Sequence, residues 1–246
     1  MRFPNLRQSG RLTAAFAMRP GLARRLFGPG QLERIHAVVD LDEDLTISDF
    51  GQTDPRVLAA LDVLVTGWGC AEIGAAQLDS MPRLRAIVHA GGTVKDHVGP
   101  DVWSRDILIT TAADANAYPV AEYTLAAILL AGKGVPELGS AYARDPGFSP
   151  ASRPDIGNYG RTVGIIGASR VGRRVIELLA PFDFTVVLYD PYLSDADPVL
   201  TRASRVSLDD LFRLASIVSI HAPLLPQTTG MVGSRQSAAS SWPSCR

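Results

Sequence analysis

The chain has 246 residues and a formal net charge of −1, with 46% hydrophobic and 20% charged residues. This length accommodates two modest domains or one large one, and the balanced charge provides no basic surface for nucleic acid. The two cysteines, Cys70 and Cys245, indicate neither a disulfide framework nor a metal site, and the four histidines show no metal-ligand spacing. Composition therefore predicts a protein without a metal centre and without a nucleic-acid partner.

The first 115 residues alternate short apolar runs with amphipathic or turn-rich segments. Alternation of this kind predicts a parallel sheet flanked by helices. The predicted strands are Leu12–Met18, Ala37–Val39, Val63–Thr66, Leu84–His89 and Ile107–Thr111, and the predicted helices include Gln31–Ile35, Pro55–Leu61 and Ala75–Met81.

The most apolar stretch, residues 118–131, begins just before Pro119. Proline at the first helical position and Glu122 in the first turn are typical of a helix start, so a helix is predicted here. Because this helix would have no polar face, we expect it to be buried between two domains. It is too short to span a bilayer, so we expect no membrane association and a cytoplasmic location. Residues 139–160, rich in Pro, Gly and Ser, are predicted to form a loop.

A glycine-rich turn joins a predicted buried strand, Thr162–Gly167, to a helix with a single apolar stripe. A second strand, Thr185–Tyr189, follows and ends at Asp190. This strand–turn–helix–strand context indicates a dinucleotide site. Backbone N–H groups and the helix dipole would face a pyrophosphate, and Asp190 would accept hydrogen bonds from a ribose diol. The predicted cofactor-binding residues of the turn are Gly167, Ala168, Ser169, Arg170, Val171 and Gly172.

Ser169 stands where the usual G-x-G-x-x-G pattern has its second glycine. We expect this serine to weaken cofactor affinity without abolishing it, because its hydroxyl can donate to a phosphate oxygen. The next basic residue after Asp190 is Arg202, so no side chain is placed to bind a 2′-phosphate, and NAD is predicted rather than NADP. The alternative interpretation is a glycine-rich turn that holds no ligand.

The chain continues through a predicted helix, Leu208–Leu214, and a third strand, Ser216–His221. With these elements, the sequence resembles the NAD-dependent D-isomer-specific 2-hydroxyacid dehydrogenases over residues 12–233. Four segments carry the resemblance in the same order and spacing: His89-Ala90-Gly91-Gly92-Thr93-Val94, Asn116-Ala117-Tyr118-Pro119-Val120-Ala121-Glu122, the glycine turn with Asp190-Pro191-Tyr192, and His221-Ala222-Pro223-Leu224 with Pro226-Gln227-Thr228.

The resemblance implies a flavodoxin-like substrate domain over residues 1–115 and a Rossmann NAD-binding domain over residues 116–246, with the helix at 118–131 between them. It also implies hydride transfer between NAD(H) and a 2-hydroxy or 2-keto acid, and a homodimer formed through the cofactor domain. The resemblance also implies binding roles for two further loops. The substrate carboxylate would lie against backbone N–H groups of Gly91, Gly92, Thr93 and Val94, and the cofactor would be lined by His221, Ala222, Pro223 and Thr228.

The segments that carry the catalytic arginine, glutamate and histidine of this family have no counterpart in the sequence. Residues 234–246 instead form a serine-biased tail without a helical stripe. This shift predicts a frameshifted or truncated product after about Gly233, and a natural polar tail is the alternative. With only Rossmann strands 1, 2 and 3 present, we expect Thr162–Gly167 to become a sheet edge and the nicotinamide half of the site to be incomplete.

The sequence leaves three functions open. The first is an oxidoreductase by descent that is inactive in this chain because the catalytic side chains are missing. The second is a non-enzymatic, NAD-binding or corepressor-like protein, and the third is a non-functional fragment. Neither His221 nor His89 is predicted to replace the missing histidine, since the resemblance gives His221 a role in lining the cofactor.

Overall fold

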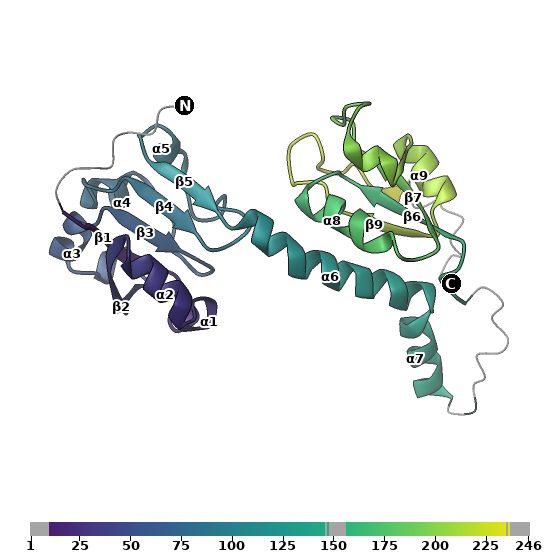
Figure 1. Cartoon of the computed structure of the whole chain (residues 1–246), viewed down its shortest axis with the longest axis horizontal. Coiled ribbons are helices and arrows are strands. Elements are labelled where there is room, and N and C mark those ends of the chain that lie inside the picture. The colour runs from purple at the N-terminus through teal and green to yellow at the C-terminus, as the bar shows by residue number, and fades with distance from the viewer. Residues whose placement is uncertain (1–9, 146, 148–155, 235, 237–246) are drawn as a thin grey trace. The chain divides into compact units, whose positions relative to one another are not determined.

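The computed structural model describes residues 10–145, 147, 156–234 and 236. The chain divides into two compact units, unit 1 over residues 1–116 and unit 2 over residues 117–246 (Figure 1). Each unit contains its own parallel sheet, as the alternation of apolar runs and helical segments predicts.

The sheet of unit 1 has five strands in the order β2-β1-β3-β4-β5, and each neighbouring pair is parallel. This is the flavodoxin-like strand order, and it confirms the predicted fold. The strands are β1 Leu12–Ala17, β2 Val39–Ile47, β3 Val63–Thr66, β4 Ala86–His89 and β5 Leu108–Thr111, and the connecting helices are α1 Leu22–Leu26, α2 Pro29–His36, the 3₁₀ turn η1 Phe50–Gln52, α3 Pro55–Ala60, α4 Ala75–Ser80 and α5 Pro100–Trp103.

The predicted bounds of the second strand are wrong, because β2 begins at Val39 and continues to Ile47. β2 lies at the edge of the sheet, and its outward side chains, among them Asp40 and Asp42, are exposed. Only alternate residues such as Leu41 reach the core, so an apolar run is not the right signal for this strand.

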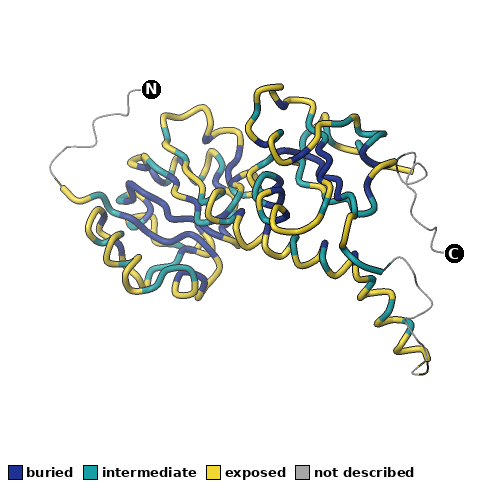
Figure 2. The backbone as a smooth tube through the Cα atoms, turned by 45° about the vertical axis from the view of Figure 1, so that its right-hand side comes forward, coloured by how far each residue is buried: buried dark blue, intermediate teal, exposed yellow. Residues whose placement is uncertain are grey.

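Both faces of the unit 1 sheet are covered by apolar side chains, as β3 shows. Leu64 packs in one buried cluster, while Val63 and Val65 pack in another. Dark-blue, buried segments of the backbone run through the middle of this unit (Figure 2). Successive side chains of a strand point to opposite faces, so a strand that is buried at each position must be covered on both sides. This packing supports the carboxyl edge of the sheet, where β4 ends at His89.

The sheet of unit 2 has the strand order β8-β7-β6-β9, again with parallel neighbours. The prediction that Thr162–Gly167 becomes a sheet edge is therefore wrong, because β6 lies between β7 and β9. A short additional strand, β8, occupies the third position beside β7, and the next strand, β9, pairs with the opposite side of β6. The two residues of β8, Ser204 and Arg205, are polar and exposed, so no apolar run predicts it. The strands are β6 Arg161–Ile166, β7 Phe184–Tyr189, β8 Ser204–Arg205 and β9 Ile217–Ile220. The helices that follow β6 are α8 Arg170–Leu179, the 3₁₀ turn η3 Pro198–Thr201 and α9 Leu208–Leu214.

The long helix α6 spans Ala113–Gly132 and therefore begins earlier than predicted, with Pro119 inside it. Burial of this helix between two domains stays a prediction. Ala121 and Ile128 pack into the core of unit 2, whereas Tyr123 is 77% exposed.

A further helix, α7 Val135–Arg144, occupies the first part of the predicted loop 139–160. Pro136 lies in its first turn, a position that proline favours, and the preceding Gly134 has a positive φ of +61°. The rest of that predicted loop includes residues 146 and 148–155, which lie outside the described residues. None of the described helices has the length and apolar content that a membrane span requires.

Candidate dinucleotide site

The glycine turn leaves β6 at Ile166 and enters α8 at Arg170. Gly167 has a φ of +96°, and a Cβ on it would lie 2.7 Å from the backbone nitrogen of Ala222. A Cβ on Gly172 would overlap the carbonyl oxygen of Gly167. Both positions therefore require glycine, the first for its conformation and the second for the close approach of α8 to the turn.

Ser169 fits the second glycine position of the pattern because its φ of −67° is ordinary for an L-residue. The side chain caps α8: its Oγ accepts a hydrogen bond from the N–H of Gly172 at 3.2 Å. The hydroxyl hydrogen of Ser169 is not used in this contact, which leaves it as a donor for an anion.

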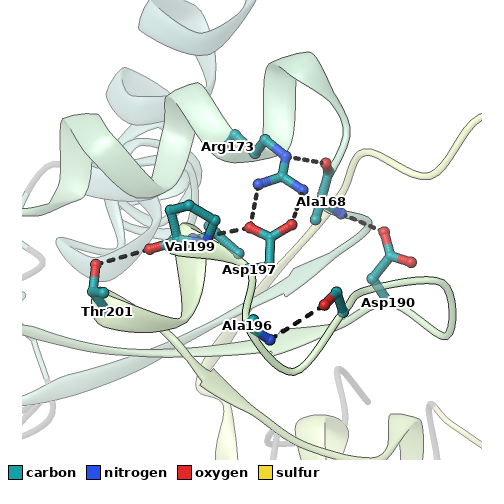
Figure 3. Close-up of polar contacts among 9 residues, drawn as sticks. Ala168, Arg173, Asp190, Ala196, Asp197, Val199 and Thr201 are labelled. Atoms are coloured by element: carbon teal, nitrogen blue, oxygen red, sulfur yellow. Dashed lines mark hydrogen bonds and ion pairs between the residues drawn. The ribbon is translucent and has the colours of Figure 1, made fainter.

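Asp190 follows the end of β7 and contacts the glycine turn directly (Figure 3). Its Oδ2 accepts a hydrogen bond from the N–H of Ala168 at 2.8 Å, and its Oδ1 accepts one from the N–H of Tyr192 at 2.9 Å. A carboxylate oxygen can accept more than one hydrogen bond, so each oxygen keeps a lone pair for a ribose hydroxyl. The structure thus brings Asp190 and the turn together, as the motif predicts.

Arg173, which sequence reasoning did not single out, adds a second charged contact to the turn (Figure 3). Its Nε donates to the carbonyl oxygen of Ala168 at 2.8 Å, and its two terminal nitrogens donate to the carboxylate of Asp197 at 2.6 and 2.7 Å. The hydrogen bonds from Arg173 and from the N–H of Val199 lower the pKa of Asp197 to about 2. In the sequence, the only sign of this contact is a basic residue, Arg173, directly after the last glycine of the turn.

The segment that follows β9 passes beside the glycine turn. The N–H of His221 donates to the carbonyl oxygen of Ile166 at 2.7 Å, which places Ala222 against Gly167. The His221 ring lies 2.9 Å from the hydroxyl of Ser219, and burial lowers its pKa. The carboxyl ends of β6 and β9 therefore meet at the point where the strand order reverses, which is where open parallel sheets bind ligands.

Thr228 has a structural part in the loop after Pro223. Its hydroxyl donates to the carbonyl oxygen of Pro223 at 2.6 Å and accepts from the N–H of Leu225 at 2.9 Å. These bonds close the loop on itself. Contact between this loop and a cofactor stays a prediction.

The predicted substrate loop, residues 91–94, follows β4 in unit 1. The N–H of Ala112 donates to the carbonyl oxygens of His89 and Gly91 at 2.9 and 3.0 Å, so β5 holds the start of the loop. Val94 is buried and Thr93 is exposed. The Thr93 hydroxyl accepts a hydrogen bond from the N–H of Lys95 at 3.3 Å. A substrate carboxylate against Gly91, Gly92, Thr93 and Val94 stays a prediction.

His89 lies beneath this loop and is only 2% exposed. Its Nδ1 is 2.9 Å from the hydroxyl of Thr66, and its ring centroid is 5.4 Å from that of His97. A Cβ on Gly91 would lie 2.5 Å from the Nε2 of His89, so the imidazole occupies the side-chain space of that glycine. Burial, and secondarily the nearby His97, lowers the pKa of His89.

Because the pKa of buried His89 is lowered, we expect the folded chain to lose stability at mildly acidic pH. The unfolded chain protonates this imidazole below about pH 6.5, whereas folded His89 takes up the proton only at lower pH. Within that window the unfolded state binds more protons, so stability falls as the pH drops. We expect urea unfolding at about pH 7.5 and about pH 5.5 to show a smaller pH dependence for His89→Gln than for the unaltered chain. An equal pH dependence in both proteins would contradict this.

Neither site histidine is paired with a carboxylate, since His89 and His221 contact hydroxyl groups. In the described part of the chain, a histidine–carboxylate contact does occur between His36 and Glu43, at 2.7 Å. It is exposed and lies where α2 leads into β2, at the amino edge of the unit 1 sheet. No three metal-ligating side chains gather among the described residues.

The strand order, the glycine turn and the contact from Asp190 define unit 2 as a dinucleotide-binding domain of the Rossmann type. Residues 125–240 match the family model described as D-isomer specific 2-hydroxyacid dehydrogenase, NAD binding domain. Unit 2 therefore carries the NAD binding domain of the D-isomer specific 2-hydroxyacid dehydrogenase family.

Curated relatives include the D-3-phosphoglycerate dehydrogenases of Mycobacterium tuberculosis and Methanocaldococcus jannaschii. The first is 33% identical over 161 residues, which cover 65% of this chain and 30% of that protein. The second is 27% identical over 178 residues, covering 72% and 34% respectively. The chain thus spans about a third of the length of these relatives.

Two solved structures share the fold. D-lactate dehydrogenase from Aquifex aeolicus, complexed with NAD and lactic acid, has a TM-score of 0.69 and 21% identity, covering 93% of this chain and 66% of that one. A D-isomer specific 2-hydroxyacid dehydrogenase from Lactobacillus delbrueckii ssp. bulgaricus, in its NAD-complexed form, has a TM-score of 0.71 and 18% identity, covering 93% and 67%.

The predicted aberrant tail, residues 234–246, falls mostly outside the described residues, which include only Ser234 and Gln236 of it. The match to the family model extends past Gly233, the residue after which the frameshift or truncation was predicted.

Proposed function

We propose that unit 2 binds NAD(H) at the carboxyl ends of β6 and β9. The observation that carries this proposal is the contact of Asp190 with the glycine turn at the point where the strand order reverses. The pyrophosphate would lie at the N-terminus of α8, near the N–H groups of Ser169, Arg170 and Val171. The ribose hydroxyls would donate to Asp190, and Ala222 and Pro223 would line the cofactor beside Gly167.

The reaction that we propose for the whole protein is hydride transfer between NAD(H) and a 2-hydroxy or 2-keto acid, whose carboxylate would lie against residues 91–94. NAD supplies the hydride acceptor in this chemistry. In the family that the sequence resembles, a histidine tuned by a glutamate moves the proton. Neither carboxyl edge offers one among the described residues, so we propose that this chain binds the cofactor without turnover. This is the first of the three functions that the sequence leaves open, an oxidoreductase by descent that is inactive in this chain; the homodimer and the cytoplasmic location stay predictions.

The test is a calorimetric titration of the full chain with NAD⁺. Asp190→Ala is expected to weaken binding by about 1–2 kcal/mol, because the ribose loses an ionised acceptor and the N–H of Ala168 loses its partner. Asp195→Ala is the control, since Asp195 is almost fully exposed and contacts Arg205. We expect it to bind as the unaltered chain does. Absence of binding by the unaltered chain would refute the proposed function, and equal affinity of Asp190→Ala would remove Asp190 from the site.

A further inference from the structure

Ala168, in the middle of the glycine turn, is held through both of its backbone polar groups. Its N–H donates to Asp190, and its carbonyl oxygen accepts from the Nε of Arg173, each at 2.8 Å (Figure 3). The first contact belongs to the dinucleotide motif. The second uses a residue for which the motif provides no role.

The guanidinium of Arg173 is fixed by Asp197. Two parallel hydrogen bonds join Arg173 to the carboxylate of Asp197, and the N–H of Val199 donates to the same carboxylate at 3.0 Å. A bidentate pair of this kind sets the plane of the guanidinium as well as its position. The Nε of Arg173 therefore presents its hydrogen to Ala168 in a defined direction.

The contact from Arg173 also fixes the direction of the N–H of Ser169, because that N–H belongs to the same peptide group as the carbonyl of Ala168. In a trans peptide, the carbonyl of one residue and the N–H of the next point in opposite directions. The bond from Arg173 to the carbonyl oxygen of Ala168 therefore directs the N–H of Ser169 to the other side. Within the described part of the chain, this N–H has no hydrogen-bond partner. It lies at the N-terminus of α8, where an anion is favoured.

We propose that Arg173 and Asp197 are positioning residues for the dinucleotide turn, which orient the Ala168–Ser169 peptide so that the N–H of Ser169 faces the pyrophosphate. The inference rests on the proposed NAD-binding function. We assign Arg173 a role through the backbone, because its Nε donates to Ala168 and its terminal nitrogens hold Asp197.

The experiment compares Arg173→Lys with Arg213→Lys in the full chain. Lysine keeps the charge but cannot bind Asp197 with two parallel bonds and Ala168 with a third. Arg213 is the matched control, because it forms an exposed ion pair with Asp210 at 2.7 Å on α9. Two quantities are measured: the Kd for NAD⁺ by calorimetry, and the amide proton shift of Ser169 at saturating NAD⁺ by NMR.

We expect Arg173→Lys to weaken NAD⁺ binding about tenfold and to lose most of the shift of the Ser169 amide, whereas Arg213→Lys changes neither. A general loss of stability would leave that shift intact at saturation, so the NMR measurement separates positioning from a structural role. Asp197→Asn, which keeps the arginine, serves as a second variant if Arg173→Lys does not fold, with the same expected losses. If the variant has the NAD⁺ affinity and the Ser169 amide shift of the unaltered chain, the inference is overturned and the proposed function is not. Failure of the unaltered chain to bind NAD⁺ would overturn the proposed function and the inference together.

Discussion

Gly172→Ala is expected to abolish NAD⁺ binding and to lower the free energy of unfolding of unit 2 by about 3 kcal/mol. The added Cβ would overlap the carbonyl oxygen of Gly167, and backbone atoms cannot move aside as a flexible side chain can. Forcing an extra methyl into a well-packed site costs about 1–3 kcal/mol, and this site is at the upper end because the clash is with the backbone. The same displacement would move the N-terminus of α8 away from the turn that is proposed to hold the pyrophosphate.

Gly139→Ala is the matched control for this substitution. Gly139 lies within α7, and a Cβ on it would have no atom within 4 Å. Alanine in place of an exposed helical glycine stabilises by about 0.5–1 kcal/mol. Urea unfolding of both variants, with calorimetric titration of NAD⁺, separates the two effects. If Gly172→Ala is as stable as the unaltered chain and binds NAD⁺ equally, the close approach described here does not exist in solution.

Asp62→Ala is expected to lower the free energy of unfolding of unit 1 by about 2–3 kcal/mol. Asp62 is fully buried at the amino edge of the sheet, where its carboxylate accepts hydrogen bonds from the N–H of Thr13 and from Arg83, each at 3.0 Å. Alanine would leave the backbone N–H of Thr13 without an acceptor, and an unpaired buried donor costs about 1–3 kcal/mol. Arg83 is 56% exposed and would be rehydrated, so it adds little to the loss.

Asp79→Ala tests whether the effect depends on burial. Asp79 contacts Arg105 at 2.6 Å, but its side chain is 72% exposed. Exposed ion pairs contribute little, so we expect no measurable loss in the urea unfolding of this variant. A loss equal to that of Asp62→Ala would mean that the carboxylate charge, and not the buried hydrogen bonds, stabilises the sheet.

The elements that the sequence predicts best are those whose signal is local. The strand at Val63–Thr66 and the helix at Leu208–Leu214 have the predicted bounds, because each is a short apolar or amphipathic run with clear ends. The glycine turn and Asp190 also meet as the motif predicts. In contrast, the start of α6 was misplaced, since the favourable position of Pro119 at a helix start does not prevent the helix from beginning earlier.

The contacts that complete the candidate site depend on residues distant in sequence. Arg173 and Asp197 are 24 residues apart, and neither has a local pattern that marks the pair. The packing of His89 against Gly91 becomes visible only when β3 and β4 lie side by side, since Thr66 on β3 orients the ring. Such contacts depend on how the strands and helices pack in the tertiary structure, which a short stretch of sequence does not reveal.

By itself, the sequence determined the fold class, the dinucleotide turn with its acid, and the family, because glycine conformation, strand periodicity and motif spacing are properties of neighbouring residues. Only the tertiary structure decided that β6 is a central strand. β8, which consists of two polar residues, occupies the third position beside β7, and β9 pairs with the other side of β6. Hydrogen bonds of the backbone form β8, and backbone hydrogen bonding does not require an apolar run.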